Sequence, residues 1–313
     1  MEKFTSKVLM FGEYSLLYNS MALTMPFDKF SGRFSYTNEA DNNHLAILSN
    51  QGLRKFCQHM LENHADESFK LNVAKFKTEL DKGLFFESNI PQGFGLGSSG
   101  ALVAAIFLRY LDKAGDFKDE IKFLTKEKIT LLKKCLGGLE GYFHGTSSGI
   151  DPLSILINAP LLLKSDNEII PVEVPVFNPE GKNVVFLLNT GLARSTEKLV
   201  TQFRAACKEE AFRNKLQKEL IHYTNSGIES FLKADTEKLY TNLDHLVQFQ
   251  LNEMSYLIPE SYKSTVKGGL ENGEYFLKIC GSGGGGYMLG FTDDWENSRE
   301  KLAGKDLEIL YRF

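Results

Sequence analysis

The sequence lacks the features that define several large protein classes. Its 313 residues contain four cysteines, none within three positions of another, so the chain has no CxxC zinc or redox pair. The six histidines show no HExxH or other metal-ligand spacing. The longest apolar runs, such as 101–108, are far shorter than the ~20 residues that span a bilayer. We therefore expect a soluble cytoplasmic protein with reduced thiols and no membrane segment.

Neither sign of charge is in large excess. The chain has 36 basic and 40 acidic side chains, a net charge of −4, so no general basic field attracts nucleic acid or an anionic membrane. Hydrophobic residues make up 42% and charged residues 24%, as in ordinary globular proteins. The length predicts about two domains. We expect a small-molecule partner, and neither nucleic acid nor a membrane.

Strands and helices are predicted in both halves of the chain, which favours an α/β or α+β architecture. Helical spacing of apolar residues, or an apolar run behind a hydroxyl cap at Ser98 or Ser99, predicts helices. Short apolar or alternating runs predict strands. The predicted helices cover 46–64, 98–113 and much of 195–256. The predicted strands cover 6–11, 69–77, 183–190 and 307–313, with a strand–turn–strand unit at 275–291.

A cluster of prolines predicts a domain boundary. Four of the eight prolines fall within twenty residues, and Gly181 follows them. Proline and glycine in such density interrupt regular structure. We therefore expect a first domain at 1–178 and a second at 179–313.

The glycines gather in two clusters, of which the first is PQGFGLGSSG at 91–100. Glycine lacks Cβ and adopts positive φ, so its backbone N–H groups can approach a ligand closely. The cluster runs into a predicted helix N-terminus, which favours an anion. It matches neither the Walker A loop nor the dinucleotide fingerprint. A phosphate-binding loop is favoured, with a ligand-free turn as the alternative.

The second cluster, GSGGGG at 281–286, lies between two predicted strands. A tight hairpin needs one or two glycines, whereas this segment has five. The excess suggests a loop that passes close to another backbone or to a ligand. A flexible turn remains the alternative.

Three motifs give the chain a family resemblance. PQGFGLGSSGALVAA at 91–105 resembles the PxxxGLGSSAA motif of the GHMP kinases, and LKICGSGGGGYMLGF at 277–291 resembles their C-terminal glycine motif. SKVLMFGEYSLLYNSMALTMP at 6–26 resembles their N-terminal motif. The three occur in the family's order.

Two further segments resemble those of the mevalonate kinases within that family. In EGYFHGTSSGID at 140–151, Glu140 precedes Asp151 by eleven positions as it does there, and NTGLARSTEKLV at 189–200 is also similar. The chain departs from the family at a few positions. Ser6 and Gly100 replace a usual Gly and Ala, and Tyr14 and Tyr18 stand where histidines are common. The two tyrosines bear on the substrate pocket and leave other acceptors open.

The resemblance implies an α+β, two-domain GHMP kinase fold. It pairs an N-terminal α/β nucleotide-binding domain with a C-terminal ferredoxin-like α/β sandwich. The implied activity is transfer of the ATP γ-phosphate, with Mg²⁺, to the hydroxyl of mevalonate, giving 5-phosphomevalonate. Phosphomevalonate, homoserine or a sugar as acceptor, and a non-catalytic binding protein, are the alternatives. A homodimer is compatible with the resemblance, although the sequence does not define the oligomeric state.

The resemblance also implies roles for individual residues. Asp151 would accept or orient the proton of the substrate hydroxyl, and Lys7 would stabilise the negative charge that develops beside it. Ser99 and Glu140 would hold Mg²⁺. Glu13, Tyr18 and Arg194 would line the substrate pocket. The nucleotide phosphates would contact Pro91, Gly93, Gly95, Leu96, Gly97, Ser98, Ser99, Gly100, Gly283 and Gly284.

Each assigned residue has a structural alternative on its own chemistry. Asp151 before Pro152 is also typical of a turn, and Lys7 of an edge strand. Glu140 suits a solvated helix face, and Arg194 a surface ion pair. His144 is interpreted as a structural hydrogen-bonding group, and Cys280 as a small buried side chain.

Overall fold

The computed structural model describes residues 1–37, 43–63, 68–121, 124–164, 168–192 and 196–313. Its contacts divide the chain into two compact units. Unit 1 comprises Met1–Lys7, Pro26–Gln92 and Leu96–Ala159, and unit 2 comprises Val8–Met25, Gly93–Gly95 and Pro160–Phe313. The chain leaves unit 1 for the last time at Pro160, the first proline of the predicted boundary. A domain boundary at residue 178 stays a prediction.

Two long strands belong in part to each unit. These are β1 (Phe4–Phe11), which confirms the strand predicted at 6–11, and β2 (Ala22–Tyr36). In unit 1, β2 pairs antiparallel with β3 (Leu84–Ser88), from Gly32 opposite Ser88 to Tyr36 opposite Leu84. In unit 2, Ala22–Thr24 of β2 pairs antiparallel with β4 (Leu161–Leu163), which pairs in turn with β5 (Ile169–Pro171).

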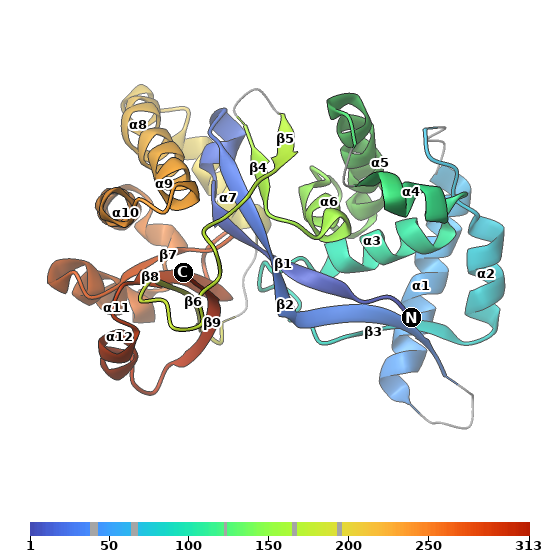
Figure 1. Cartoon of the computed structure of the whole chain (residues 1–313). Helices are drawn as coiled ribbons and strands as arrows, with labels where there is room; N and C mark the ends of the chain where they lie inside the picture. The colour runs from blue at the N-terminus through green and yellow to red at the C-terminus, as the bar shows by residue number, and fades with distance from the viewer. Residues whose placement is uncertain (38–42, 64–67, 122–123, 165–167, 193–195) are drawn as a thin grey trace. The chain divides into compact units, whose positions relative to one another are not determined.

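Unit 1 is mainly helical, and α3 is central to it. Helix α3 packs against both α5 and α6 (Figure 1). Its Ala, Val, Ile and Phe side chains are buried on nearly every side, as the sequence predicts for 98–113. The helix at 46–64 is likewise confirmed. The helices of this unit are α1 (His44–Asn63), α2 (Val73–Asp81), α3 (Ser98–Tyr110), α4 (Ala114–Glu120), α5 (Lys126–His144) and α6 (Ile150–Ile157).

The predicted cap of α3 is wrong. The N-cap is Gly97, in the left-handed conformation with φ 79°, and no side chain caps this end. Ser98 and Ser99 lie one and two positions inside the helix. A capping residue has non-helical backbone, whereas both serines already belong to the helix, so the cap position falls on Gly97. The Ser99 hydroxyl donates to Glu140 over 2.9 Å.

The predicted strand at 69–77 is also wrong, because most of it belongs to α2. The Asn72 side chain accepts from Lys75 N–H and caps this helix. Phe76 and Leu80, four positions apart, form its buried face. Only Leu71 makes a β-bridge, with Leu111. The alternation of Phe69, Leu71 and Val73, which reaches the first residue of α2, is typical of a strand, whereas the Asn72 cap starts a helix there.

Unit 2 contains a four-stranded antiparallel sheet in the order β7-β8-β6-β9. Its strands are β6 (Val184–Asn189), β7 (Phe276–Ile279), β8 (Tyr287–Thr292) and β9 (Asp306–Arg312), which confirms the predictions at 183–190, 275–291 and 307–313. Strand β6 is central, and its first five residues are buried.

The predicted helix-rich stretch at 195–256 is confirmed, and helices continue beyond it. Helix α10 packs against β7 and against α9. Within the described part of the chain, no helix combines the length and apolarity needed to cross a membrane. The helical segments of unit 2 are η1 (Ser15–Tyr18), α7 (Thr196–Ala206), α8 (Glu210–Lys215), the π-helix η4 (Leu216–Ile221), α9 (His222–Leu232), α10 (Thr236–Glu253), η5 (Ser255–Leu257), α11 (Glu260–Asn272) and α12 (Trp295–Lys301).

Candidate active site

Lys7 and Asp151 form an ion pair in unit 1. The Lys7 Nζ lies 2.7 Å from Asp151 Oδ1. Lys7 comes from β1 and its side chain is 7% exposed, whereas that of Asp151, in the first turn of α6, is 37% exposed. The pair therefore offers one solvent-accessible carboxylate whose neighbour is a nearly buried cation. The sequence predicts these two residues as neighbours; their roles in a reaction stay predictions.

Two glycines of the first cluster make room for this pair. A Cβ on Gly97 would lie 3.2 Å from Lys7 Cγ and 3.0 Å from Ile155 Cδ1. A Cβ on Gly100 would lie 2.9 Å from the backbone nitrogen of Pro152 and 3.1 Å from Asp151 Cβ. The first turn of α3 therefore lies directly on the Lys7 side chain and on the turn that begins with Asp151.

Glu140, on α5, is buried next to this pair and held by hydroxyl groups. Ser99 Oγ donates to its Oε1 over 2.9 Å, and Ser147 Oγ donates to its Oε2 over 2.5 Å. The His144 Nε2 lies 3.0 Å from Ser99 Oγ, so His144 forms the hydrogen bond expected of it. Sequence reasoning missed Ser147. The hydroxyl run at 146–148, directly after the helix that carries Glu140, is the signal that pointed to it.

The charge of Glu140 is costly where it lies. Burial raises the pKa of the Glu140 carboxyl, and the negative charge of Asp151 raises it further, against the hydrogen bonds from Ser147 and Ser99 that lower it. A cation between the two carboxylates would relieve both effects. The chemistry of this cluster therefore favours binding of a positive ion.

The donor set fits Mg²⁺. Ser99 offers a hydroxyl oxygen and Glu140 a carboxylate, both hard oxygen ligands. No group of three or more His, Cys, Asp or Glu side chains suited to a metal occurs among the described residues. Mg²⁺ is usually held by one or two carboxylates together with substrate phosphates and water, and Glu140 is a carboxylate of this kind.

The backbone of the first glycine cluster is shaped by positive φ angles. Gly93, Gly95 and Gly97 have φ values of 79°, 81° and 79°. Leu96 is fully buried, and its carbonyl accepts from Lys7 N–H over 3.1 Å, whereas Pro91 is half-buried. The N–H groups of Ser98, Ser99 and Gly100 open α3, where a helix has no backbone acceptors of its own. Contact of these residues with phosphate stays a prediction.

The glycines of the second cluster allow close backbone packing within unit 2. Gly281, Gly283, Gly284, Gly285 and Gly286 all have positive φ. Gly284 N–H donates to Leu257 O over 2.6 Å, and Gly286 N–H to Leu192 O over 2.8 Å. A Cβ on Gly283 would lie 2.7 Å from Leu257 O. The excess of glycine thus serves approach to other backbone segments. A phosphate contact of Gly283 and Gly284 stays a prediction.

Glu13 forms an ion pair that is almost completely buried. Lys278 Nζ lies 2.5 Å from Glu13 Oε1, with side chains 0% and 2% exposed respectively, and it also donates to Ile279 O over 2.9 Å. Sequence reasoning missed Lys278. Its signal is a lysine in the middle of the apolar strand sequence YFLKIC at 275–280.

Tyr14 and Tyr18 surround Phe203. The Tyr14 ring lies 4.6 Å from that of Phe203, and the Tyr18 ring 5.9 Å from it, between centroids. Tyr14 OH donates to Ser282 O in the second glycine cluster over 2.6 Å. A hydrogen bond with Cys207, together with burial, raises the pKa of the Tyr18 hydroxyl. Substrate contact of Glu13 and Tyr18 stays a prediction, and Arg194 lies outside the described residues.

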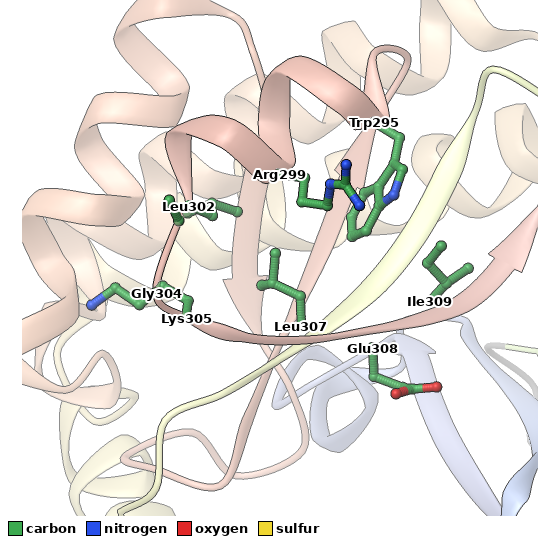
Figure 2. A pocket seen from close by; sticks show the side chains of 9 residues that line it. Trp295, Arg299, Leu302, Gly304, Lys305, Leu307, Glu308 and Ile309 are labelled. Atoms are coloured by element: carbon green, nitrogen blue, oxygen red, sulfur yellow. The ribbon is translucent and has the colours of Figure 1, made fainter.

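A separate hollow of about 500 Å³ lies in unit 2 between α12 and β9 (Figure 2). Trp295 and Arg299 lie side by side on its helical wall. The Arg299 guanidinium pairs with Glu296 over 2.8 Å, so its charge is already balanced. None of the predicted site residues lines this hollow.

Comparison with known families and structures gives concordant results. Residues 54–157 match the family described as GHMP kinases N terminal domain. The matched segment includes Ser99, Glu140 and Asp151, and it excludes Lys7. No curated protein matches the chain significantly in sequence.

Solved structures similar to this chain share its fold at low sequence identity. An L. major mevalonate kinase in complex with R-mevalonate is 16% identical with a TM-score of 0.59, over 96% of this chain and 90% of that one. A Streptococcus pneumoniae phosphomevalonate kinase, in complex with phosphomevalonate and AMPPNP, is 14% identical with a TM-score of 0.63, over 98% and 99%. A Lactococcus lactis galactokinase complexed with galactose is 13% identical with a TM-score of 0.64, over 99% and 93%.

Proposed function

We propose that this chain, which has the GHMP kinase fold and contains a GHMP kinase N-terminal domain, transfers the γ-phosphate of ATP to a small alcohol. Mevalonate, converted to 5-phosphomevalonate, is the proposed acceptor. One observation carries the proposal. The Lys7–Asp151 ion pair, the buried Glu140 and the Ser99 hydroxyl all adjoin the N-terminus of α3.

Asp151 and Lys7 would act on the acceptor hydroxyl. Asp151 is the accessible carboxylate of the cluster, so it can accept a hydrogen bond from that hydroxyl and take its proton. Lys7, held against Gly97, keeps the carboxylate oriented and stabilises negative charge as the hydroxyl attacks. Positioning and charge neutralisation are the main requirements of phosphoryl transfer.

Glu140 and Ser99 would hold Mg²⁺, which when bound neutralises phosphate charge. The hydroxyl groups of Ser99 and Ser147 keep the Glu140 carboxylate in one orientation. The glycine backbone at 93–97 and the first N–H groups of α3 would receive the phosphates. The whole phosphate-binding set would be Pro91, Gly93, Gly95, Leu96, Gly97, Ser98, Ser99, Gly100, Gly283 and Gly284.

Mevalonate is proposed because the segment at 140–151 resembles that of the mevalonate kinases. The similar solved structures hold mevalonate, phosphomevalonate and galactose, so they support a small alcohol as the acceptor. Glu13, Tyr18 and Arg194 would contact this acceptor, with Arg194 on its carboxylate. The proposal includes a cytoplasmic location, in keeping with four buried cysteines that form no disulfide with one another. Other acceptors and a purely binding role are outcomes of the experiment below.

The experiment measures ATP consumption with mevalonate, phosphomevalonate, homoserine and galactose, for the wild type and for Asp151→Asn. We expect turnover of mevalonate by the wild type and a loss of about 10²–10⁴-fold in kcat for the variant. If only another acceptor is turned over, that acceptor takes the place of mevalonate in the proposed function. No turnover of any acceptor contradicts the proposed activity, and a small effect of Asp151→Asn contradicts the role of Asp151.

A further inference from the structure

Ser147 connects the two carboxylate-bearing helices of unit 1. Its hydroxyl donates to Glu140 Oε2 over 2.5 Å and accepts from Gly149 N–H over 3.0 Å. Gly149 is the N-cap of α6, whose first turn carries Asp151. The Ser147 hydroxyl therefore links the Glu140 carboxylate on α5 to the N-cap of α6, the helix that carries Asp151 in its first turn.

The position of Ser147 is fixed by backbone packing. A Cβ on Gly137 would lie 2.9 Å from Ser147 O and 3.1 Å from Gly149 N. A Cβ on Gly149 would lie 2.0 Å from Lys133 O, so only glycine fits there. The segment 147–149 thus lies directly on the backbone of α5. The packing of this segment therefore holds the Ser147 hydroxyl at the Glu140 carboxylate.

The two oxygens of the Glu140 carboxylate accept hydrogen bonds from two different serines. Ser99 donates to Oε1 and Ser147 to Oε2, one hydroxyl to each oxygen. An ionised carboxylate has about four acceptor positions, so each oxygen retains one for a metal ion. Hydrogen bonds on both oxygens also prevent rotation of the carboxylate plane. Ser99 is itself a proposed metal ligand, whereas the Ser147 hydroxyl bonds to Glu140 and to Gly149 N–H and is not one.

We infer that Ser147 is a positioning residue that orients Glu140 toward the Mg²⁺ of the bound nucleotide. The inference rests on the proposed function, because that proposal supplies the metal and the nucleotide. Hydrogen-bond partners of metal-binding side chains typically contribute 10–100-fold to metal affinity. Ser147 therefore acts on metal-dependent binding of the nucleotide and has little effect on the binding of the nucleotide alone.

The experiment measures the affinity for AMPPNP by calorimetry, once with Mg²⁺ and once with EDTA. The dissociation constant with EDTA divided by that with Mg²⁺ gives the factor by which the metal strengthens binding. We expect this ratio to fall about 10-fold or more in Ser147→Ala, with the EDTA value unchanged. Ser147→Thr keeps the hydroxyl and should restore the ratio. Thr130→Ala, which removes an exposed hydroxyl elsewhere on α5, is the matched control.

The outcomes separate the inference from the proposed function. An unchanged ratio in Ser147→Ala, with a wild type that transfers phosphate, overturns the inference alone. Equal losses with Mg²⁺ and with EDTA, together with a lower melting temperature, also overturn it, since they indicate a merely structural role. A wild type that neither transfers phosphate nor binds AMPPNP more tightly with Mg²⁺ overturns both. If Ser147→Ala does not unfold cooperatively, Ser147→Cys replaces it, because a thiol is only a weak donor.

Discussion

At the scale of residues, small side chains decide where the reactive groups lie. Gly97 and Gly100 bring the start of α3 against Lys7 and Asp151, and neither glycine offers chemistry of its own. Glu140 stays buried because Ser99 and Ser147 supply hydrogen bonds to both of its oxygens. The geometry of the candidate active site therefore depends on glycines that permit close packing as well as on the charged side chains.

Gly97→Ala should damage both stability and activity. A non-glycine residue at φ 79° costs about 1–2 kcal/mol, and the new methyl group meets Lys7 Cγ. We expect a loss of that size in urea unfolding, and a lower kcat because Lys7 is displaced. Gly115→Ala is the control, since a Cβ there meets nothing within 4 Å. Equal stability of Gly97→Ala and wild type would contradict the packing argument.

Lys278→Met should be among the most destabilising single changes in unit 2. It leaves the buried carboxylate of Glu13 without its cation, which typically costs 3–5 kcal/mol. The double variant Glu13→Gln with Lys278→Met removes both charges and should recover a large part of this loss. Urea denaturation of the two single variants and the double variant measures the coupling. Strictly additive losses would indicate that the two charges do not interact.

Single residues also mark the limits of prediction from sequence. Lys7, Glu140 and Asp151 were identified because motifs with fixed spacing carry them. Lys278 and Ser147 were missed because only the folded chain brings Lys278 to Glu13 and Ser147 to Glu140. The choice of mevalonate as acceptor stays a prediction, because Tyr14 and Tyr18 pack on Phe203 in a way that no motif specifies.

At the scale of elements, capping and helix pairing outweigh local alternation. The segment 69–77 alternates like a strand, yet the Asn72 cap and the buried Phe76 and Leu80 make α2 a helix. Helix α3 was predicted correctly because apolar residues occupy nearly all its sides, and its cap was not, because Gly97, packed on Lys7 and Ile155, takes the cap position. Long apolar elements are therefore readable from sequence, while their ends depend on tertiary contacts.

Glu79→Gln should show how much the Glu79 carboxylate of α2 contributes to the contact with α3. Arg109 Nε and Tyr110 OH lie 2.6 and 2.7 Å from Glu79 Oε2. Burial raises the pKa of the Glu79 carboxyl, but the hydrogen bonds from Arg109 and Tyr110 outweigh it, so the pKa is lowered in the folded state. A lowered folded pKa stabilises the protein above the unfolded pKa of about 4.3, and this stability is lost as the pH falls through the folded pKa.

We expect Glu79→Gln to lose about 1–3 kcal/mol at pH 7, and this deficit to shrink as the pH falls below about 4. Urea unfolding at several pH values measures it. Glu87→Gln is the control, because Glu87 and its partner Arg33 are both about half exposed, and such pairs contribute little. A deficit that does not change with pH would contradict a role for the Glu79 charge.

At the scale of the whole molecule, the chain order and the compact units do not coincide. Unit 2 begins with Val8–Met25 and resumes only at Pro160, apart from Gly93–Gly95. The GHMP kinase family resemblance, confirmed by the match at 54–157, predicts the two-part α+β fold that the structure has. This interleaving was not predicted, because proline and glycine density reports interruptions of the chain and carries no information on which distant strands pair.

A fragment of residues 160–313 should not fold on its own. It lacks Glu13, the partner of the buried Lys278, and it lacks Ala22–Thr24, to which β4 is paired. An unpaired buried cation and an open strand edge both disfavour the native unit. We expect no cooperative thermal transition in calorimetry or near-UV dichroism. A sharp transition with native-like dichroism would show that Val8–Met25 is dispensable.

The Glu13–Lys278 ion pair also delays the folding of unit 2 during synthesis, because Glu13 is made long before Lys278. The two residues are 265 positions apart, and translation at about 5–20 residues per second needs roughly 13–50 s to cover that distance. The first strands leave the ribosome during this interval, before β7 and β8 of the unit 2 sheet have been synthesised. The segment Val8–Met25 therefore lacks the partner of Glu13, and stays accessible to chaperones and to other nascent chains, until Lys278 has been synthesised.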